Sequence, residues 1–111
     1  MKLEKIKYKN FKATVTTMSR KTATQHGLYG FYTPNNNTIV IQKDLNKRDY
    51  LDTLIHEIFH FVADKSGIKF RNLGEEGVAK FVGSEFSKIL IQNPKLVNVI
   101  KWCAKPWVYF F

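Results

Sequence analysis

The sequence predicts a single α+β domain in which a small antiparallel sheet of about three strands precedes two or three helices. Apolar residues recur at nearly every second position in residues 5–15, the spacing of a half-buried strand. Two further β-rich runs flank the turn-forming segment "TPNNN". From about residue 49 the apolar spacing becomes helical. A chain of 111 residues has room for one hydrophobic core, so residues 1–111 are expected to form one domain.

The first predicted strand is strongly basic. Ile6 and Tyr8, then Phe11, Ala13 and Val15, recur at every second position among lysines and threonines. The alternation slips near Asn10, where we expect a bend or bulge. Residues 1–24 carry seven basic side chains against one acid, within a net charge of +9. Solvent-facing positions of a half-buried strand explain this spacing. The same charge can attract nucleic acid, an anionic membrane or acidic proteins.

The remaining elements follow in order. Residues 28–32 and 38–42 are expected to pair as a hairpin, since Pro and Asn fill the segment between them. A helix is predicted from about residue 49 to residue 65, where Gly67 supplies a stop. A second helix is predicted over about 75–92 and ends at Asn93-Pro94. The tail is expected to form a short third helix and an extended aromatic end.

The first of these helices contains the sequence "HEIFH", residues 56–60. His56 and His60 fall about 40° apart on a helical wheel, so both imidazoles can reach one ion at roughly 2.0–2.1 Å. Glu57 is turned about 100° from His56 and can instead face a metal-activated water as general base. A solvated polar face of an ordinary amphipathic helix would also contain such residues.

A third ligand is expected from the segment "EEGVA", residues 75–79. Together with "HEIFH" it resembles the gluzincin zinc metallopeptidases, in which a glutamate of an E-G-x-A-like segment on the next helix completes the site. The resemblance implies Glu76 as the third ligand. Helical periodicity places Glu75 nearer the apolar face, where a carboxylate is costly unless it meets a cation, so Glu75 is the alternative. Glu85 is expected to be an ordinary surface acid.

The resemblance covers most of residues 5–94. "GLYGFY…NTIVIQ", "LDTLIHEIFHFVADKSG" and "EEGVAKFV…ILIQNP" look like the minimal metallopeptidase-like domains of phages and bacteria that are related to the ImmA/IrrE group. This likeness implies a zincin-like fold, one Zn²⁺ per chain, and a peptide substrate extended along an edge strand, here residues 38–42.

Two departures from the family pattern affect the site. The step of sixteen residues from His60 to Glu76 implies a short loop between the helices. Position 80, where some relatives carry an acid that supports a histidine ligand, is Lys80. Asp52 or Asp64, each one helical turn from a histidine, could take that supporting role.

The predicted function is therefore a zinc-dependent hydrolase, a metallopeptidase with Glu57 as general base. The candidates for a second oxyanion donor are His26, Tyr32, Tyr50 and Tyr109, and the sequence selects none of them. The alternative function is a non-catalytic, zinc-stabilised basic module that binds nucleic acid or a protein partner. Its basic strand would then act together with the aromatic residues Trp102, Trp107, Tyr109, Phe110 and Phe111.

The expected location is the cytoplasm of a bacterial host or phage-infected cell, the origin being implied by the resemblance. The chain has no signal-peptide pattern and no apolar stretch of bilayer length. Its single cysteine, Cys103, suits a reducing compartment. No membrane partner is expected.

Overall fold

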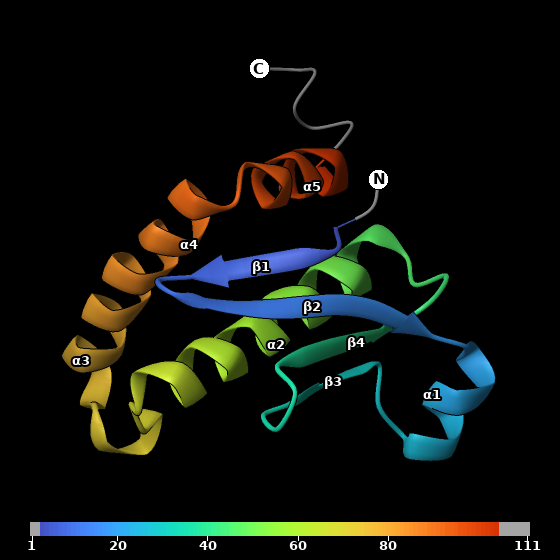
Figure 1. The fold of residues 1–111 in the computed structure, drawn as a ribbon, viewed down its shortest axis with the longest axis horizontal. Helices are drawn as coiled ribbons and strands as arrows, with labels where there is room; N and C mark the ends of the chain where they lie inside the picture. The colour runs from blue at the N-terminus through green and yellow to red at the C-terminus, as the bar shows by residue number, and fades with distance from the viewer. Residues whose placement is uncertain (1–2, 105–111) are drawn as a thin grey trace.

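The chain folds into an α+β structure with one mixed four-stranded sheet (Figure 1). The computed structural model describes residues 3–104. Trp107, Tyr109, Phe110 and Phe111 of the aromatic tail lie outside these residues. The strands are β1 (Lys5–Tyr8), β2 (Phe11–Met18), β3 (Gly30–Thr33) and β4 (Thr38–Gln42). The helices are α1 (Arg20–His26), α2 (Lys47–Ser66), α3 (Gly74–Phe81), α4 (Ser87–Gln92) and α5 (Pro94–Ala104), with a short 3₁₀ turn at Phe70–Asn72 and a π-helical turn at Val82–Phe86.

The sheet differs from the expected three antiparallel strands in number and in direction. Its order is β1-β2-β4-β3, and β4 runs parallel to β2 while the other two pairs are antiparallel. The predicted first strand is two strands joined by a tight turn, in which Lys9 has a φ of 55°. A two-residue turn of this kind reverses the chain, so the slip near Asn10 marks a hairpin rather than a bulge.

One short helix was not expected from the sequence. Helix α1 leads from β2 to β3 and allows β4 to lie beside β2 in parallel. Ser19 caps its start, since its side chain accepts a hydrogen bond from the Thr22 N–H, and Gly27 ends it at a φ of 67°. Only Ala23 of this helix is buried, so it leaves no periodic apolar pattern to detect. His26 lies in the last turn of α1.

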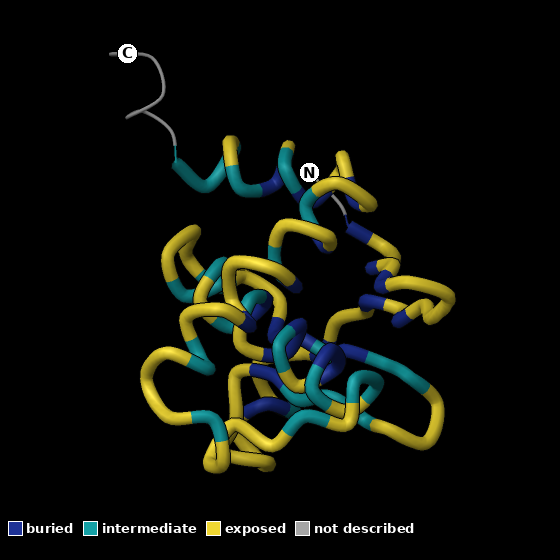
Figure 2. Tube along the Cα trace, turned by 90° about the vertical axis from the view of Figure 1, so that its left-hand side faces the viewer, coloured by how far each residue is buried: buried dark blue, intermediate teal, exposed yellow. Residues whose placement is uncertain are grey.

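Helix α2 covers one face of the sheet over β3 and β4, while α4 packs against β1 and α5 against α2 (Figure 1). Buried positions gather inside this arrangement, and the loops and outer helix faces are exposed (Figure 2). The fully buried side chains include Ile6, Tyr8, Ile39, Ile41, Leu54, Ile58, Phe61, Val62, Ile89, Leu96 and Val99. The opposite face of β1 and β2 carries exposed lysines and threonines.

The two main helical predictions are confirmed in outline. Asn46 caps α2 by accepting a hydrogen bond from the Asp49 N–H, and Gly67 ends it at a φ of 73°. The helix expected over 75–92 is divided by the π-helical turn into α3 and α4. It ends at Asn93, as expected before a proline, and Pro94 begins α5. None of the helices within residues 3–104 has the length and apolar character needed to cross a bilayer.

Glu85 is buried, which corrects the expectation of a surface acid. Its carboxylate accepts hydrogen bonds from Lys88 Nζ at 2.8 Å, Tyr8 Oη at 2.6 Å and Ser84 Oγ at 3.0 Å. The bonds from Lys88 and Tyr8 hold the pKa of Glu85 down at about 2, although burial opposes this shift. Burial and the same carboxylate raise the pKa of Tyr8 to about 12. The hydrogen bond between the Glu85 carboxylate and Tyr8 thereby links the π-helical turn to β1.

Candidate metal centre

Helix α2 brings His56 and His60 together on its exposed side, one turn apart. Their Nε2 atoms lie 3.0 Å apart, and their rings meet edge to face at 4.7 Å between centroids. As free imidazoles they can hold this contact only when one Nε2 carries a proton and the other offers a lone pair. With both Nε2 atoms deprotonated, each offers a lone pair that a shared ion could accept.

The donor set fits a divalent cation. Two nitrogens bound tetrahedrally to one ion at about 2.0–2.1 Å lie roughly 3.3 Å apart, close to the observed separation. His56, Glu57 and His60 each offer a ligand atom within 4.8 Å of the others, and no other such group of three occurs within residues 3–104. Both histidines are exposed, whereas Glu57 is only 6% exposed. The site can therefore hold a metal ion with a carboxylate directly beside it.

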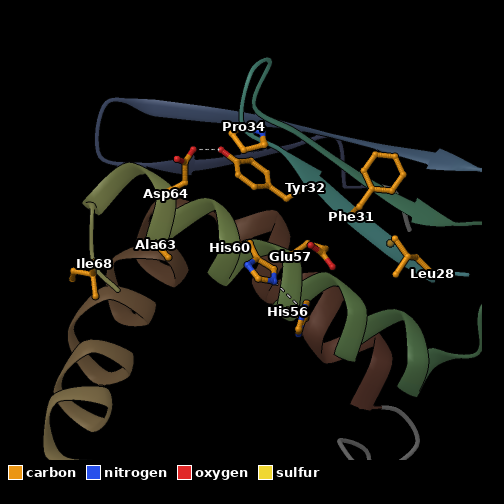
Figure 3. Close-up of a pocket in the computed structure, with 11 residues that line it drawn as sticks. Leu28, Phe31, Tyr32, Pro34, His56, Glu57, His60, Ala63, Asp64 and Ile68 are labelled. Atoms are coloured by element: carbon orange, nitrogen blue, oxygen red, sulfur yellow. Dashed lines mark hydrogen bonds between the residues drawn. The ribbon is translucent and has the colours of Figure 1, made fainter. Parts of the chain in front are cut away.

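The three residues line a cleft of about 580 Å³ between α2 and β3 (Figure 3). On the strand side its wall is formed by Leu28, Gly30, Phe31, Tyr32 and Pro34. On the helix side it continues past the histidines to Ala63, Asp64 and Ile68. A smaller hollow of about 170 Å³ shares Gly30, His56 and Glu57 with the cleft and extends it to Tyr29, Asp52 and Thr53. The open space thus runs along β3, past the candidate metal ligands.

Gly30 sets how closely the strand approaches the helix. A Cβ atom at this position would lie 2.6 Å from Thr53 Cγ2, 2.8 Å from the Val40 carbonyl oxygen and 3.7 Å from Glu57 Cγ. The first two distances are shorter than any normal contact, so a larger residue here would force its neighbours to shift. Sequence analysis did not single out this residue. A glycine inside the β-prone run "GLYGFY" is nevertheless a signal of close backbone approach.

The two edges of the sheet are not equivalent. At β1, the side-chain amides of Asn93 and Gln92 bond both the N–H and the C=O of Lys7 and Lys9, which closes that edge at these two residues. At β3, the Gln42 N–H bonds the Tyr29 carbonyl, and antiparallel alternation then turns the backbone groups of Gly30 and Tyr32 away from β4. Both residues line the cleft.

The edge strand beside the site is therefore β3, and the expectation that residues 38–42 form this edge is wrong. Strand β4 lies between β2 and β3, and its two sides are paired. The hairpin itself is confirmed, but the crossover through α1 moves its second strand to the interior of the sheet.

Four residues were candidates for the oxyanion donor, and of these Tyr32 lines the cleft. His26 and Tyr50 do not line it, and Tyr109 lies outside the residues that the structure describes. The Tyr32 hydroxyl donates to Asp64 Oδ2 at 2.7 Å and lies 3.2 Å from Asn37 Oδ1. Burial and the bond to Asp64 raise the pKa of Tyr32, and the same bond lowers the pKa of Asp64. Tyr32 is therefore held protonated, with its hydroxyl directed to this carboxylate (Figure 3).

The acids expected to support the histidines are placed differently. Within the described part of the chain, the only hydrogen-bond partner of each imidazole is the other imidazole. Asp64 is bonded to Tyr32 instead, and Asp52 lines the smaller hollow. The structure does not bring either acid to a histidine nitrogen.

Glu75 and Glu76 lie in the first turn of α3, and both are exposed. Neither belongs to the group that could hold a metal. For Glu76 to act as the third ligand, its carboxylate must come closer to the two imidazoles than it lies here. Its role as a ligand stays a prediction, with Glu75 as the alternative.

Comparison with protein-family models, with curated proteins and with solved structures finds no match to this chain.

Proposed function

We propose that the chain is a zinc-dependent hydrolase with a zincin-like arrangement, a metallopeptidase that cleaves peptide bonds. One observation carries the proposal: two histidine nitrogens lie 3.0 Å apart beside a buried glutamate, in a cleft bordered by an open strand edge. Each part corresponds to a need of the reaction, namely metal ligands, a base and a place for substrate.

His56 and His60 are the proposed ligands of the ion, and the family resemblance supports Glu76 as the third. A bound Zn²⁺ supplies positive charge that acidifies a water molecule and polarises a substrate carbonyl. Histidine ligation suits this metal, and an open fourth position distinguishes a catalytic site from a structural one. The exposed position of both imidazoles leaves room for water and substrate.

Glu57 is the proposed general base. Its carboxylate lies beside the histidines and lines both the cleft and the smaller hollow. It accepts a proton from the attacking water, whose oxygen adds to the carbonyl carbon of the peptide bond. The protonated carboxyl then delivers this proton to the amine nitrogen as the C–N bond breaks. A purely structural metal site would have no use for an acid between its histidines.

The cleft supports an extended peptide as substrate. The outward backbone groups of Gly30 and Tyr32 can pair with a peptide strand, which would add to the sheet at β3. Leu28, Phe31 and Pro34 line the same side of the cleft, and Ile68 lies at its far end. These side chains favour substrates with apolar residues near the cleaved bond.

The proposal is tested by incubating zinc-loaded protein with a peptide library and identifying the cleaved bonds by mass spectrometry. We expect cleavage that stops when zinc is chelated and returns when zinc is restored, with an unchanged circular dichroism spectrum. Products that form equally in the chelated sample would refute zinc-dependent hydrolysis.

A further inference from the structure

A second hollow, of about 480 Å³, lies near β1, at the opposite edge of the sheet from β3. It forms where the outer face of β1 and β2 meets the corner between α4 and α5. Its lining residues are Glu4, Lys5, Lys7, Lys12, Gln92, Asn93, Pro94 and Lys95. We call this region the basic groove. It shares no residue with the cleft that contains the histidines.

The groove concentrates positive charge. Four lysines from β1, β2 and α5 line it, against one acid, Glu4, and all four lysines are exposed. None of the four forms an ion pair with another residue of the described range 3–104. The groove therefore holds a positive potential that its own residues leave largely uncompensated.

The clustered lysines lower the stability of the fold. Lys7 lies directly opposite Lys12 in the β1–β2 register, and like charges at directly opposed positions destabilise a sheet. Lys5 lies on the same face of β1 as Lys7, about 6.7 Å away along the strand. A bound polyanion would turn this repulsion into attraction at each of the three positions.

The closed edge of β1 limits what can bind. The amides of Asn93 and Gln92 already occupy the outward backbone groups of Lys7 and Lys9, so a peptide strand cannot pair with these two residues. The groove also offers no aromatic or large apolar side chain as an anchor, and lysine is depleted in protein–protein interfaces. Lysines that neutralise phosphates are instead the usual means of binding nucleic acid without regard to its sequence.

We propose that the basic groove binds the phosphate backbone of nucleic acid. Lys5, Lys7, Lys12 and Lys95 make the phosphate contacts, and no base is read. This binding is independent of the metal centre, because the two sites have no residue in common.

The test measures the fluorescence anisotropy of a labelled DNA duplex against protein concentration at several salt concentrations. With four phosphate contacts, the affinity should fall about 100-fold between roughly 50 and 200 mM salt. Each single Lys→Gln variant in the groove should reduce the slope of log affinity against log salt by about 0.9. The quadruple variant K5Q/K7Q/K12Q/K95Q should bind at least about tenfold more weakly at a salt concentration of about 100 mM.

A matched variant changes the net charge by the same amount but leaves the groove intact. K21Q/K43Q/K69Q/K80Q removes four exposed lysines that do not line the groove. It should keep most of the affinity, and circular dichroism should show both quadruple variants folded. Equal losses in the two variants would overturn the groove as the site. A polyglutamate peptide that displaces the DNA at equal charge concentration would overturn nucleic acid as its ligand. Binding that requires zinc would also contradict the proposal.

Discussion

Gly30 lies so close to Thr53 that a Cβ atom on the glycine would come within 2.6 Å of the threonine methyl group. This contact fixes the distance between β3 and α2, and with it the width of the cleft beside His56 and Glu57. The position of the sheet edge relative to the candidate metal ligands therefore depends on this close approach.

The first prediction concerns this contact. Gly30→Ala should lower the free energy of unfolding by about 1–3 kcal/mol, because the added methyl group must push the strand and helix apart. It should also reduce peptide cleavage, since Glu57 Cγ lies next to the added atom. Chemical denaturation and a cleavage assay measure the two effects.

Gly83→Ala is the control, because nothing lies within 4 Å of a Cβ built at that position. It should leave the stability unchanged or raise it by up to about 1 kcal/mol through helix propensity. If Gly30→Ala behaved like Gly83→Ala, the close approach would not matter to the site.

The second prediction separates chemistry from metal binding. Glu57→Gln should retain zinc and reduce hydrolysis by about 10²–10⁴-fold, because an amide cannot accept the proton of the attacking water. Elemental analysis gives the zinc content, and initial cleavage rates give the activity. Asp44→Asn is the control, because it makes an equal change in charge at an exposed residue outside the cleft. It should retain both the zinc content and the activity. Full activity in Glu57→Gln would remove this residue from the mechanism.

The third prediction concerns the remaining ligand. Glu76→Gln should lower zinc affinity by at least about 10–100-fold. Replacing a residue that only supports a metal ligand already causes a loss of this size, and a ligand should matter at least as much. Glu75→Gln should have a smaller effect. Competition with a zinc-binding dye measures both affinities. A larger loss in Glu75→Gln would make Glu75 the ligand, and no loss in either would exclude α3 from the site.

The fourth prediction follows from the depressed pKa of Glu85, which is about 2 in the fold against an ordinary value of 4.5. A carboxyl whose pKa is lower in the folded state stabilises the fold fully above its unfolded pKa. This stabilisation, about 1–3 kcal/mol, should disappear as the pH falls from about 4.5 to 2. Denaturant titrations across this range, made without added metal, measure it.

Glu85→Gln should remove the pH-dependent part of this stability. The variant should be less stable than the parent at pH 7 and should approach it near pH 2. Glu75→Gln, which changes an exposed acid, should follow the parent across the range. Parallel curves for the parent and Glu85→Gln would show that the buried carboxylate does not hold β1 to the helix.

The sequence predicts the elements whose signals are local. Helix α2 carries a periodic apolar face, a capping asparagine at Asn46 and a stop at Gly67, so its existence and end could be predicted. Asn93-Pro94 similarly marks the end of α4. The pair His56 and His60 meets as expected, because an interval of four residues within one helix fixes the contact.

What the sequence does not predict depends on contacts between distant residues. Glu85 is buried by Tyr8, which is 77 positions away, so its own neighbours in the sequence show only an acid on a helix. Strand β3 becomes the edge because β4 pairs with β2 across a crossover, and alternation within a strand does not reveal its partners. The place of Glu76 depends on how the loop after Gly67 directs α3, which no local pattern encodes.

The zinc content of protein purified without added metal tests the central claim most directly. Elemental analysis should find about one zinc per chain in the parent, and a His56→Ala/His60→Ala variant, shown to be folded by circular dichroism, should hold almost none. Equal zinc in both proteins, or none in the parent even after incubation with zinc, would contradict a metal centre on α2.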